Sequence, residues 1–182
     1  MKVYELFEEL DKYVGDIELT KKDVINGKIR DKQPTIVTGD FYCNNLGLTT
    51  LENTPTKVTG YFNCYNNKLT SLEGAPTSTA DFYCVDNPHI TSLEGIGTKY
   101  LTEIKGCILL NNCPIKSHIL GLLKIQKLTK VEMNSNKKVE NIVNKYLKST
   151  SSRKLQKCKA ELEDAGLEEF AQLWKYMNYL KN

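Results

Sequence analysis

The sequence predicts an α/β solenoid, in which short turns of chain stack along one short parallel β-sheet and a helical segment closes each end. The first observation is a repeat, because residues 60–76 have a close copy at 39–55 and another at 80–97. The second is a Phe-x-Cys motif in each copy, and these motifs start 21 and 20 residues apart. A period of this length with one strand-like motif per unit is typical of solenoids. The third is the helical spacing of apolar residues on both sides of the repeats.

Residues 1–34 are predicted to form an N-terminal helical cap. Acidic residues dominate the first turns of this segment, and its apolar residues recur at helical spacing. Because the terminal turn of a solenoid exposes its apolar side, we expect the helix to cover the first edge of the stack. Residues 20–23 resemble another helix start, and the chain up to Pro34 is assigned to cap and linker. The apolar stripe consists of Val3, Leu6, Phe7, Leu10 and Val14.

The second repeat shows how one turn is expected to fold. Phe62 and Cys64 alternate with Asn63, so a short strand directs the first two inward and Asn63 toward solvent. Leu69 and Leu72 then bring the chain back to the core. An asparagine, Asn67, stands between these two groups. Its amide is suited to bond backbone groups that a curved chain leaves unpaired.

This turn resembles a known repeat family. The pattern F-x-C-x-x-N-x-L-x-x-L from Phe62 to Leu72 is similar to the leucine-rich repeat L-x-L-x-x-N-x-L-x-x-L. With its F-x-C, NN and LTSLEGAP motifs, the sequence resembles short leucine-rich-repeat proteins of large tailed bacteriophages. In the first copy Leu46 replaces the asparagine, and the third copy has one extra residue before Ile90. The resemblance implies action in an infected bacterial cytoplasm, by occupying a host protein or an anti-phage defence protein.

Two weaker turns extend the solenoid to residues 35–136, about five turns in all. Residues 108–115 and 128–136 both align with the first repeat. Between them Ile119, Leu122 and Leu123 have helical spacing, so the side of the stack away from the sheet is expected to become helical there.

Residues 137–182 are predicted to form a C-terminal helical cap. The apolar residues of 139–147 form one stripe at helical spacing. Serines and a threonine at 149–152 interrupt it and offer N-caps for a helix that ends before Gly166. A final amphipathic helix is predicted over residues 170–180. These helices are expected to close the second end of the stack.

Composition and motifs exclude several classes of function. No glycine-rich phosphate loop, dinucleotide fingerprint or nucleophile elbow is present, so no enzyme activity and no cofactor are predicted. The six cysteines lack metal-binding spacing, and a cysteine that recurs at an inward position is expected to be a core residue. No apolar run reaches the length of a membrane span, and the start of the chain lacks a signal-peptide pattern. A cytoplasmic protein with reduced cysteines and no membrane contact is predicted.

The outward positions of the predicted sheet form the candidate binding site. Tyrosines among asparagines and aspartates offer rigid contact area with adaptable hydrogen bonds, which favours a protein partner. The alternative is that these tyrosines only cover the sheet and stabilise cross-strand packing. A solenoid commonly uses its concave face for binding, so we predict a protein–protein interaction module. The strand positions are Tyr42, Asn63, Tyr83, Leu109 and Glu132, with the flanks Asp40, Asn44, Tyr61, Tyr65, Asp81, Val85 and Asp86.

Charge is strongly segregated along the chain, which supplies a second hypothesis. Residues 1–104 carry 10 Lys/Arg and 15 Asp/Glu, whereas residues 105–160 carry 13 Lys/Arg and only 2 Asp/Glu. A basic helical segment at 137–159 is able to follow nucleic-acid phosphates. It contains one arginine and no exposed aromatic side chain that would read bases, so this hypothesis is the alternative. Its residues are Lys137, Lys138, Lys145, Lys148, Arg153, Lys154 and Lys157.

Overall fold

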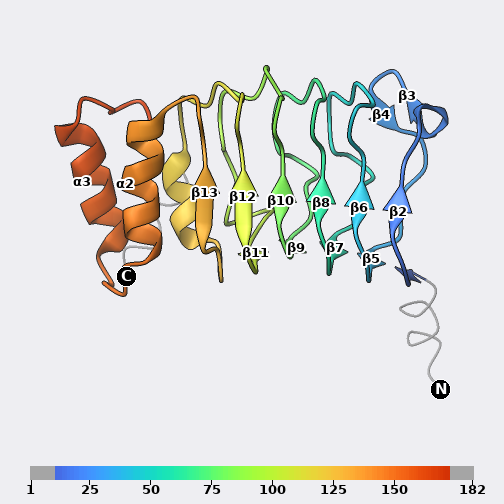
Figure 1. Ribbon diagram of the computed structural model, residues 1–182, viewed down its shortest axis with the longest axis horizontal. Coiled ribbons are helices and arrows are strands. Elements are labelled where there is room, and N and C mark those ends of the chain that lie inside the picture. The colour runs from blue at the N-terminus through green and yellow to red at the C-terminus, as the bar shows by residue number, and fades with distance from the viewer. Residues whose placement is uncertain (1–10, 173–182) are drawn as a thin grey trace.

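The computed structural model describes residues 11–172 and shows a parallel β-solenoid of about five turns followed by two helices (Figure 1). Successive turns lie side by side along the long axis of the molecule, in the order of the sequence. The predicted stack of repeats is therefore confirmed. No family can be read from this architecture alone, because unrelated sequences share solenoid folds.

The strands that face the viewer in Figure 1 form a six-stranded parallel sheet, which we call the front sheet. Its register aligns the repeats as the sequence predicts, with Phe41 opposite Phe62 and Phe62 opposite Phe82. Every strand is only two or three residues long, so each turn depends on its neighbours. The strands are β2 (Ile17–Glu18), β6 (Phe41–Tyr42), β8 (Phe62–Asn63), β10 (Phe82–Tyr83), β12 (Cys107–Leu109) and β13 (Lys130–Glu132).

A second parallel sheet was not predicted from the sequence, and the expectation of a single sheet is wrong. Each turn except the one that ends in β13 adds a strand here a few residues before its strand in the front sheet. The signal was the recurrence of an inward apolar residue two positions after a threonine, as in Val37 after Thr35 and Val58 after Thr56. Two-residue strands are too short to show an alternating pattern. The strands are β1 (Lys12–Tyr13), β5 (Ile36–Val37), β7 (Lys57–Val58), β9 (Ser78–Thr79) and β11 (Glu103–Ile104).

The core runs through the stack as ladders of like residues. Phe62 stacks on Phe41 and on Phe82 with ring centroids 5.4 Å apart in both pairs. Cys43, Cys64 and Cys84 follow two residues later and are fully buried. The inward direction of Phe and Cys is therefore confirmed. Stacked rings at this separation add attraction to the area they bury.

The N-terminal segment differs from the prediction within the described residues. Residues 1–10, which carry most of the predicted apolar stripe, lie outside the described residues. From Asp11 to Pro34 no helical cap is seen. The chain forms β1 and β2, which begin the two sheets, then a short 3-10 helix, η1 (Lys21–Asp23), and an antiparallel pair, β3 (Val24–Ile25) and β4 (Lys28–Ile29). The helix start predicted at Thr20 is present as a capping box between Thr20 and Asp23.

Buried asparagines tie adjacent turns together. Asn67 donates to the carbonyl oxygens of Cys43 and Cys64, and its Oδ1 accepts from the backbone of Leu48 at 2.9 Å. One turn later the side-chain amide of Asn87 donates to the carbonyl oxygen of Cys64. In the turn after that, the thiol of Cys113 donates to the carbonyl oxygen of Cys84. The expected backbone-bonding role of Asn67 is confirmed, and a cysteine continues the ladder.

The predicted helices are confirmed within the described residues, but the N-cap of the helix after residues 149–152 is Arg153, not one of the predicted serines or threonine. A 3-10 helix, η2 (Ile119–Lys124), lies between the last two turns, and α2 (Lys137–Leu147) and α3 (Lys154–Asp164) follow the solenoid. Asn136 occupies the ladder position of its turn, but its side chain accepts from the backbone of Val139 and caps α2. Most of the helix predicted over 170–180 lies outside the described residues.

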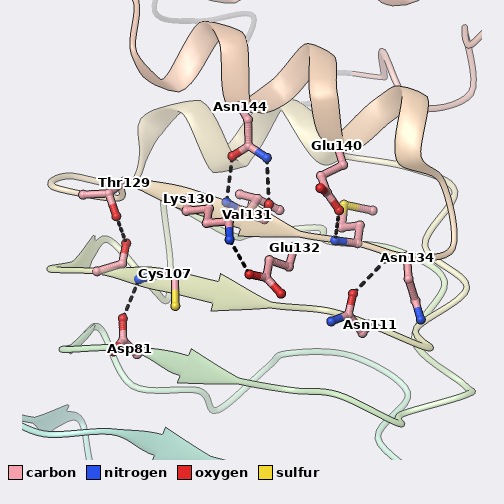
Figure 2. Close-up of polar contacts among 12 residues, drawn as sticks. Asp81, Cys107, Asn111, Thr129, Lys130, Val131, Glu132, Asn134, Glu140 and Asn144 are labelled. Atoms are coloured by element: carbon pink, nitrogen blue, oxygen red, sulfur yellow. Dashed lines mark hydrogen bonds and ion pairs between the residues drawn. The ribbon is translucent and has the colours of Figure 1, made fainter.

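Helix α2 covers the free edge of β13 (Figure 2). Asn144 accepts from the backbone nitrogen of Val131 at 2.8 Å and donates to its carbonyl oxygen at 2.7 Å. Glu140 accepts from the backbone nitrogen of Met133 at 2.6 Å and also binds Lys137. These side chains take the place of a next strand, so the predicted closure of this end by helices is confirmed.

Candidate functional site: the outward face of the front sheet

The candidate residues occupy three columns that cross strands β6, β8 and β10. The register places Tyr42, Asn63 and Tyr83 opposite one another in the middle column. Residues two positions before and after share the outward direction because side chains alternate along a strand. Backbone bonds from Asn45 to Tyr65 and from Asn66 to Val85 extend the pairing past the assigned strands. The outer columns are Asp40, Tyr61 and Asp81 on one side and Asn44, Tyr65 and Val85 on the other.

Four tyrosines therefore surround Asn63, and we call Tyr42, Tyr61, Tyr65 and Tyr83 the tyrosine diamond. Tyr61 and Tyr65 are among the most exposed large apolar residues of the described chain, at 42% and 37%. The rings of Tyr61 and Tyr83 contact each other, with centroids 5.5 Å apart and tilted by 42°. Asn63 accepts from the backbone of Tyr65 at 3.0 Å, which holds its side chain at the centre.

Two aspartates fix the diamond along one side. Asp40 accepts the hydroxyl of Tyr42 at 2.7 Å and the backbone N–H of Tyr61 at 2.7 Å. Asp81 accepts the backbone N–H of Cys107 in the following turn (Figure 2). The bond to Asp40 raises the pKa of Tyr42 to about 12, and burial beside Asp81 raises the pKa of Tyr83 to about 12. Both phenols are therefore neutral donors at physiological pH.

The same face carries carboxylates without matching cations. Within residues 11–172 every ion pair uses a glutamate, and none uses the aspartates of the front sheet. The lysine on this face, Lys130, is paired with Glu132 at 2.5 Å (Figure 2). The face therefore presents a net negative charge. Its carboxylates without an ion pair to residues 11–172 are Asp16, Glu18, Asp40 and Asp81, to which Asp86 adds a fifth at the end of β10.

The structure brings most of the predicted binding residues together. Asn44 and the four tyrosines lie in the three columns, as do Asn63 and Asp81. Asp86 lies just beyond them, where its left-handed backbone ends the strand and its carboxylate accepts from Asn112 at 2.6 Å. Sequence reasoning missed Asp16 and Glu18, which extend the acidic face onto β2. The signal was an aspartate directly before the first core residue, present in Asp16-Ile17 as in Asp40-Phe41.

The predicted basic residues lie on the C-terminal helices and on the segment that connects them, away from the diamond (Figure 1). Three of these lysines make internal contacts: Lys137 pairs with Glu140, Lys145 pairs with Glu161, and Lys138 donates to the carbonyl oxygen of Ala165. The remaining cations have no ion pair among residues 11–172. They are Lys148, Arg153, Lys154 and Lys157.

The cysteines and histidines of the described chain offer little chemistry. Burial raises the pKa values of the Cys43 and Cys64 thiols, which disfavours the reactive thiolate. His118 bonds Ser92 through Nδ1 at 2.8 Å. Between Asp11 and Gln172 no three residues of the metal-binding types come together. In the same range no helix has the length and hydropathy needed to cross a bilayer.

Comparisons of the chain with models of protein families, with curated proteins and with solved structures gave no match.

Proposed function

We propose that this chain is a non-enzymatic protein-binding module that holds its partner on the outward face of the front sheet. The tyrosine diamond is the observation that carries this proposal, because it places four aromatic side chains on three adjacent strands. Tyrosine is, with tryptophan and arginine, enriched among the central interface residues that contribute most to protein–protein binding.

The rigidity of the scaffold supports the same conclusion. The diamond stands directly over the stacked phenylalanines, and the backbone of each strand is bonded to both neighbours. Tyr42 is also held by Asp40. Side chains that are already ordered lose little conformational entropy on binding, so more of their contact energy appears as affinity.

The kind of partner is proposed from the resemblance of the repeats to phage leucine-rich-repeat proteins. In that setting the module acts in the cytoplasm of an infected bacterium. It occupies a host protein or an anti-phage defence protein and inhibits it by covering a surface that the target needs. The repeats supply the scaffold for this role, and the diamond supplies the contact.

A capture experiment with matched variants tests the proposal. The wild-type chain and a Tyr61→Ser/Tyr65→Ser variant are immobilised and exposed to bacterial lysate, and captured proteins are identified and then tested in purified form by calorimetry. Tyr13→Ser is the control, because Tyr13 is equally exposed at 43% but belongs to the second sheet. We expect the double variant to lose the partner and the control to keep it. Equal binding by all three chains contradicts the proposal.

A second candidate function is nucleic-acid binding through the C-terminal helices. The observation that favours it is the group of four cations without an ion pair among residues 11–172: Lys148, Arg153, Lys154 and Lys157. A mobility-shift assay with single-stranded and duplex DNA tests it. Binding that weakens steeply with salt and is lost in Lys154→Gln/Lys157→Gln supports this candidate.

A further inference from the structure

The column Asp40, Tyr61, Asp81 places an exposed tyrosine between two aspartates of the adjacent turns. Resting on the proposed function, we propose that the partner inserts an arginine here, with its guanidinium group over the ring of Tyr61 and bonded to Asp40, while Asp81 adds negative charge to the site. The partner therefore contacts this face through a basic protein surface.

Register fixes the spacing of the three groups. They directly precede β6, β8 and β10, so the backbone of each lies about 5 Å from the backbone of the next along the column. A guanidinium group is attracted to an aromatic ring when it lies within about 6 Å of the ring centre. A cation over Tyr61 is therefore within reach of Asp40, which accepts from the backbone of Tyr61, whereas the carboxylate of Asp81 is directed toward Cys107 in the following turn.

The carboxylates are oriented but not neutralised. Asp40 receives one donor on each oxygen, from Tyr61 N at 2.7 Å and from the Tyr42 hydroxyl at 2.7 Å. Each carboxylate oxygen has about two acceptor sites, so each retains one for an incoming donor. Because no lysine or arginine of residues 11–172 pairs with Asp40 or Asp81, their charge is available to a partner.

Arginine fits this arrangement better than lysine. Its planar guanidinium stacks on an aromatic face and also bonds a carboxylate through two N–H groups, whereas an ammonium acts as a point charge. Both aspartates are half-buried between tyrosines, where water screens a charge less than at a fully exposed site.

Charge on the rest of the molecule directs a basic partner to this face. Asp16 and Glu18 extend the negative charge from Asp40 onto the neighbouring strand β2. The second sheet and its borders instead expose lysines, which repel such a partner. They are Lys12, Lys57 and Lys105.

Nuclear magnetic resonance titrations of the full chain test the inference. The probes are three short Gly/Ser peptides that carry a central pair of arginines, lysines or glutamines. We expect the arginine peptide to shift the amide signals of Tyr61 and the side-chain amide of Asn63. Its affinity should exceed that of the lysine peptide by about threefold, and the glutamine peptide should not bind. Equal binding of the glutamine peptide, or shifts confined to α2 and α3, overturns the inference.

Variants supply a second readout. Asp40→Asn/Asp81→Asn keeps the oxygen acceptors for Tyr61 and Cys107 but removes both charges, and it should weaken binding of the arginine peptide by about tenfold or more. The control, Glu52→Gln, removes a carboxylate that pairs with Lys28 at another part of the surface and should bind as wild type does. Unchanged affinity of the aspartate variant overturns the inference.

Two further outcomes separate this inference from the proposed function. If the captured lysate protein is lost with the tyrosine variant but kept with the aspartate variant, the proposed binding face is supported and the proposed arginine contact is wrong. If the Tyr61 and Asn63 signals shift with protein concentration alone, and the aspartate variant abolishes this shift, a second copy of the chain is the occupant. That result also overturns the inference.

Discussion

Gly60 lies directly against the carboxylate of Asp40 in the preceding turn, and a Cβ atom on Gly60 would fall 1.9 Å from Asp40 Oδ1. Gly39 and Gly106 have the same relation to Asp16 and Asp81. In the turn that contains β8, Tyr61 stands at the position of these aspartates. In the following turn, Ala80 stands at the position of these glycines. An aspartate directly before a strand of the front sheet therefore requires a glycine at the adjoining position of the next turn. The carboxylate and a Cβ atom cannot both occupy the space between the two strands.

This relation predicts coupling between the two residues. We expect Gly60→Ala to destabilise the fold by about 1–3 kcal/mol, as overpacking does, and Asp40→Ala to recover part of that loss. The recovery should be partial, because the added Cβ would also stand 2.7 Å from the carbonyl oxygen of Gly39. Urea unfolding of both single variants and the double variant measures the coupling. Ala80→Gly is the control and should cost about 1 kcal/mol or less. Strictly additive effects contradict the relation.

The asparagine ladder should be important for stability. Asn67→Ala leaves the carbonyl oxygen of Cys43 and the backbone nitrogen of Leu48 buried without the partner they have now. Each such group costs about 1–3 kcal/mol, so we expect a loss of about 2 kcal/mol or more in the free energy of unfolding. Chemical denaturation compares it with Asn44→Ala, a half-buried outward residue that should have little effect. Similar losses in both variants would contradict a special role for Asn67.

The contacts of α2 with β13 predict a local effect on hydrogen exchange. Asn144→Leu removes both bonds to Val131, so the amide hydrogen of Val131 should exchange faster with solvent. Glu140→Gln keeps an oxygen that accepts from Met133 and should preserve the protection of that amide. Amide signals of β6 and β8, several turns away, serve as the internal reference. Uniform acceleration at all strands would indicate global destabilisation instead.

The phenol of Tyr42 should ionise at a higher pH than the phenol of an ordinary tyrosine. The folded-state pKa of Tyr42 is raised from 10.0 to about 12, with the hydrogen bond to Asp40 as the largest cause. The folded state therefore holds its proton more tightly than the unfolded state. The stability that results is fully present below pH 10 and is lost as the pH rises from about 10 to about 12. Ultraviolet titration of phenolate formation should show a late phase that loses one phenol in Tyr42→Phe, while Tyr83 and Tyr100, whose pKa values are also raised to about 12, remain in it. A titration curve unchanged by that substitution rules out the effect.

Thiol reactivity should distinguish Cys107 from the core cysteines. Cys43, Cys64, Cys84 and Cys113 are buried, whereas Cys107 is partly exposed on the front sheet. Burial and the neighbouring Asp81 raise the pKa of Cys107 to about 11, so it should react slowly with an aromatic disulfide reagent. The buried thiols should react only after unfolding in denaturant. Rapid reaction of several thiols in the native chain would show that the core opens readily.

The sequence predicted the parts of the fold that depend on large core residues. The spacing of Phe41, Phe62 and Phe82 set the register of the front sheet, and the stripe over 139–147 located α2. The second sheet was missed because its strands hold one inward residue each, such as Val37, which is too little for a pattern. The N-terminal segment was misjudged because single residues such as Ile17 complete a sheet without any repeat motif.

The candidate site was partly predictable for a similar reason. Alternation along each strand identified Tyr42, Asn63 and Tyr83 as outward residues. Their arrangement as a diamond depends on the exact alignment of three strands, and a shift of one residue between β6 and β8 would have separated Tyr61 from Asp40. The bond between Tyr42 and Asp40 is a matter of side-chain geometry, which spacing alone does not specify.

The way in which Glu140 and Asn144 occupy the border of β13 has a consequence for assembly. A stack of parallel strands is a template onto which further chains can polymerise, as they do in amyloid fibrils. At the C-terminal end that template is already filled by two side chains of the same molecule, and an incoming strand would first have to displace α2. The repeats can thus stay short and nearly identical while growth past the last turn is blocked.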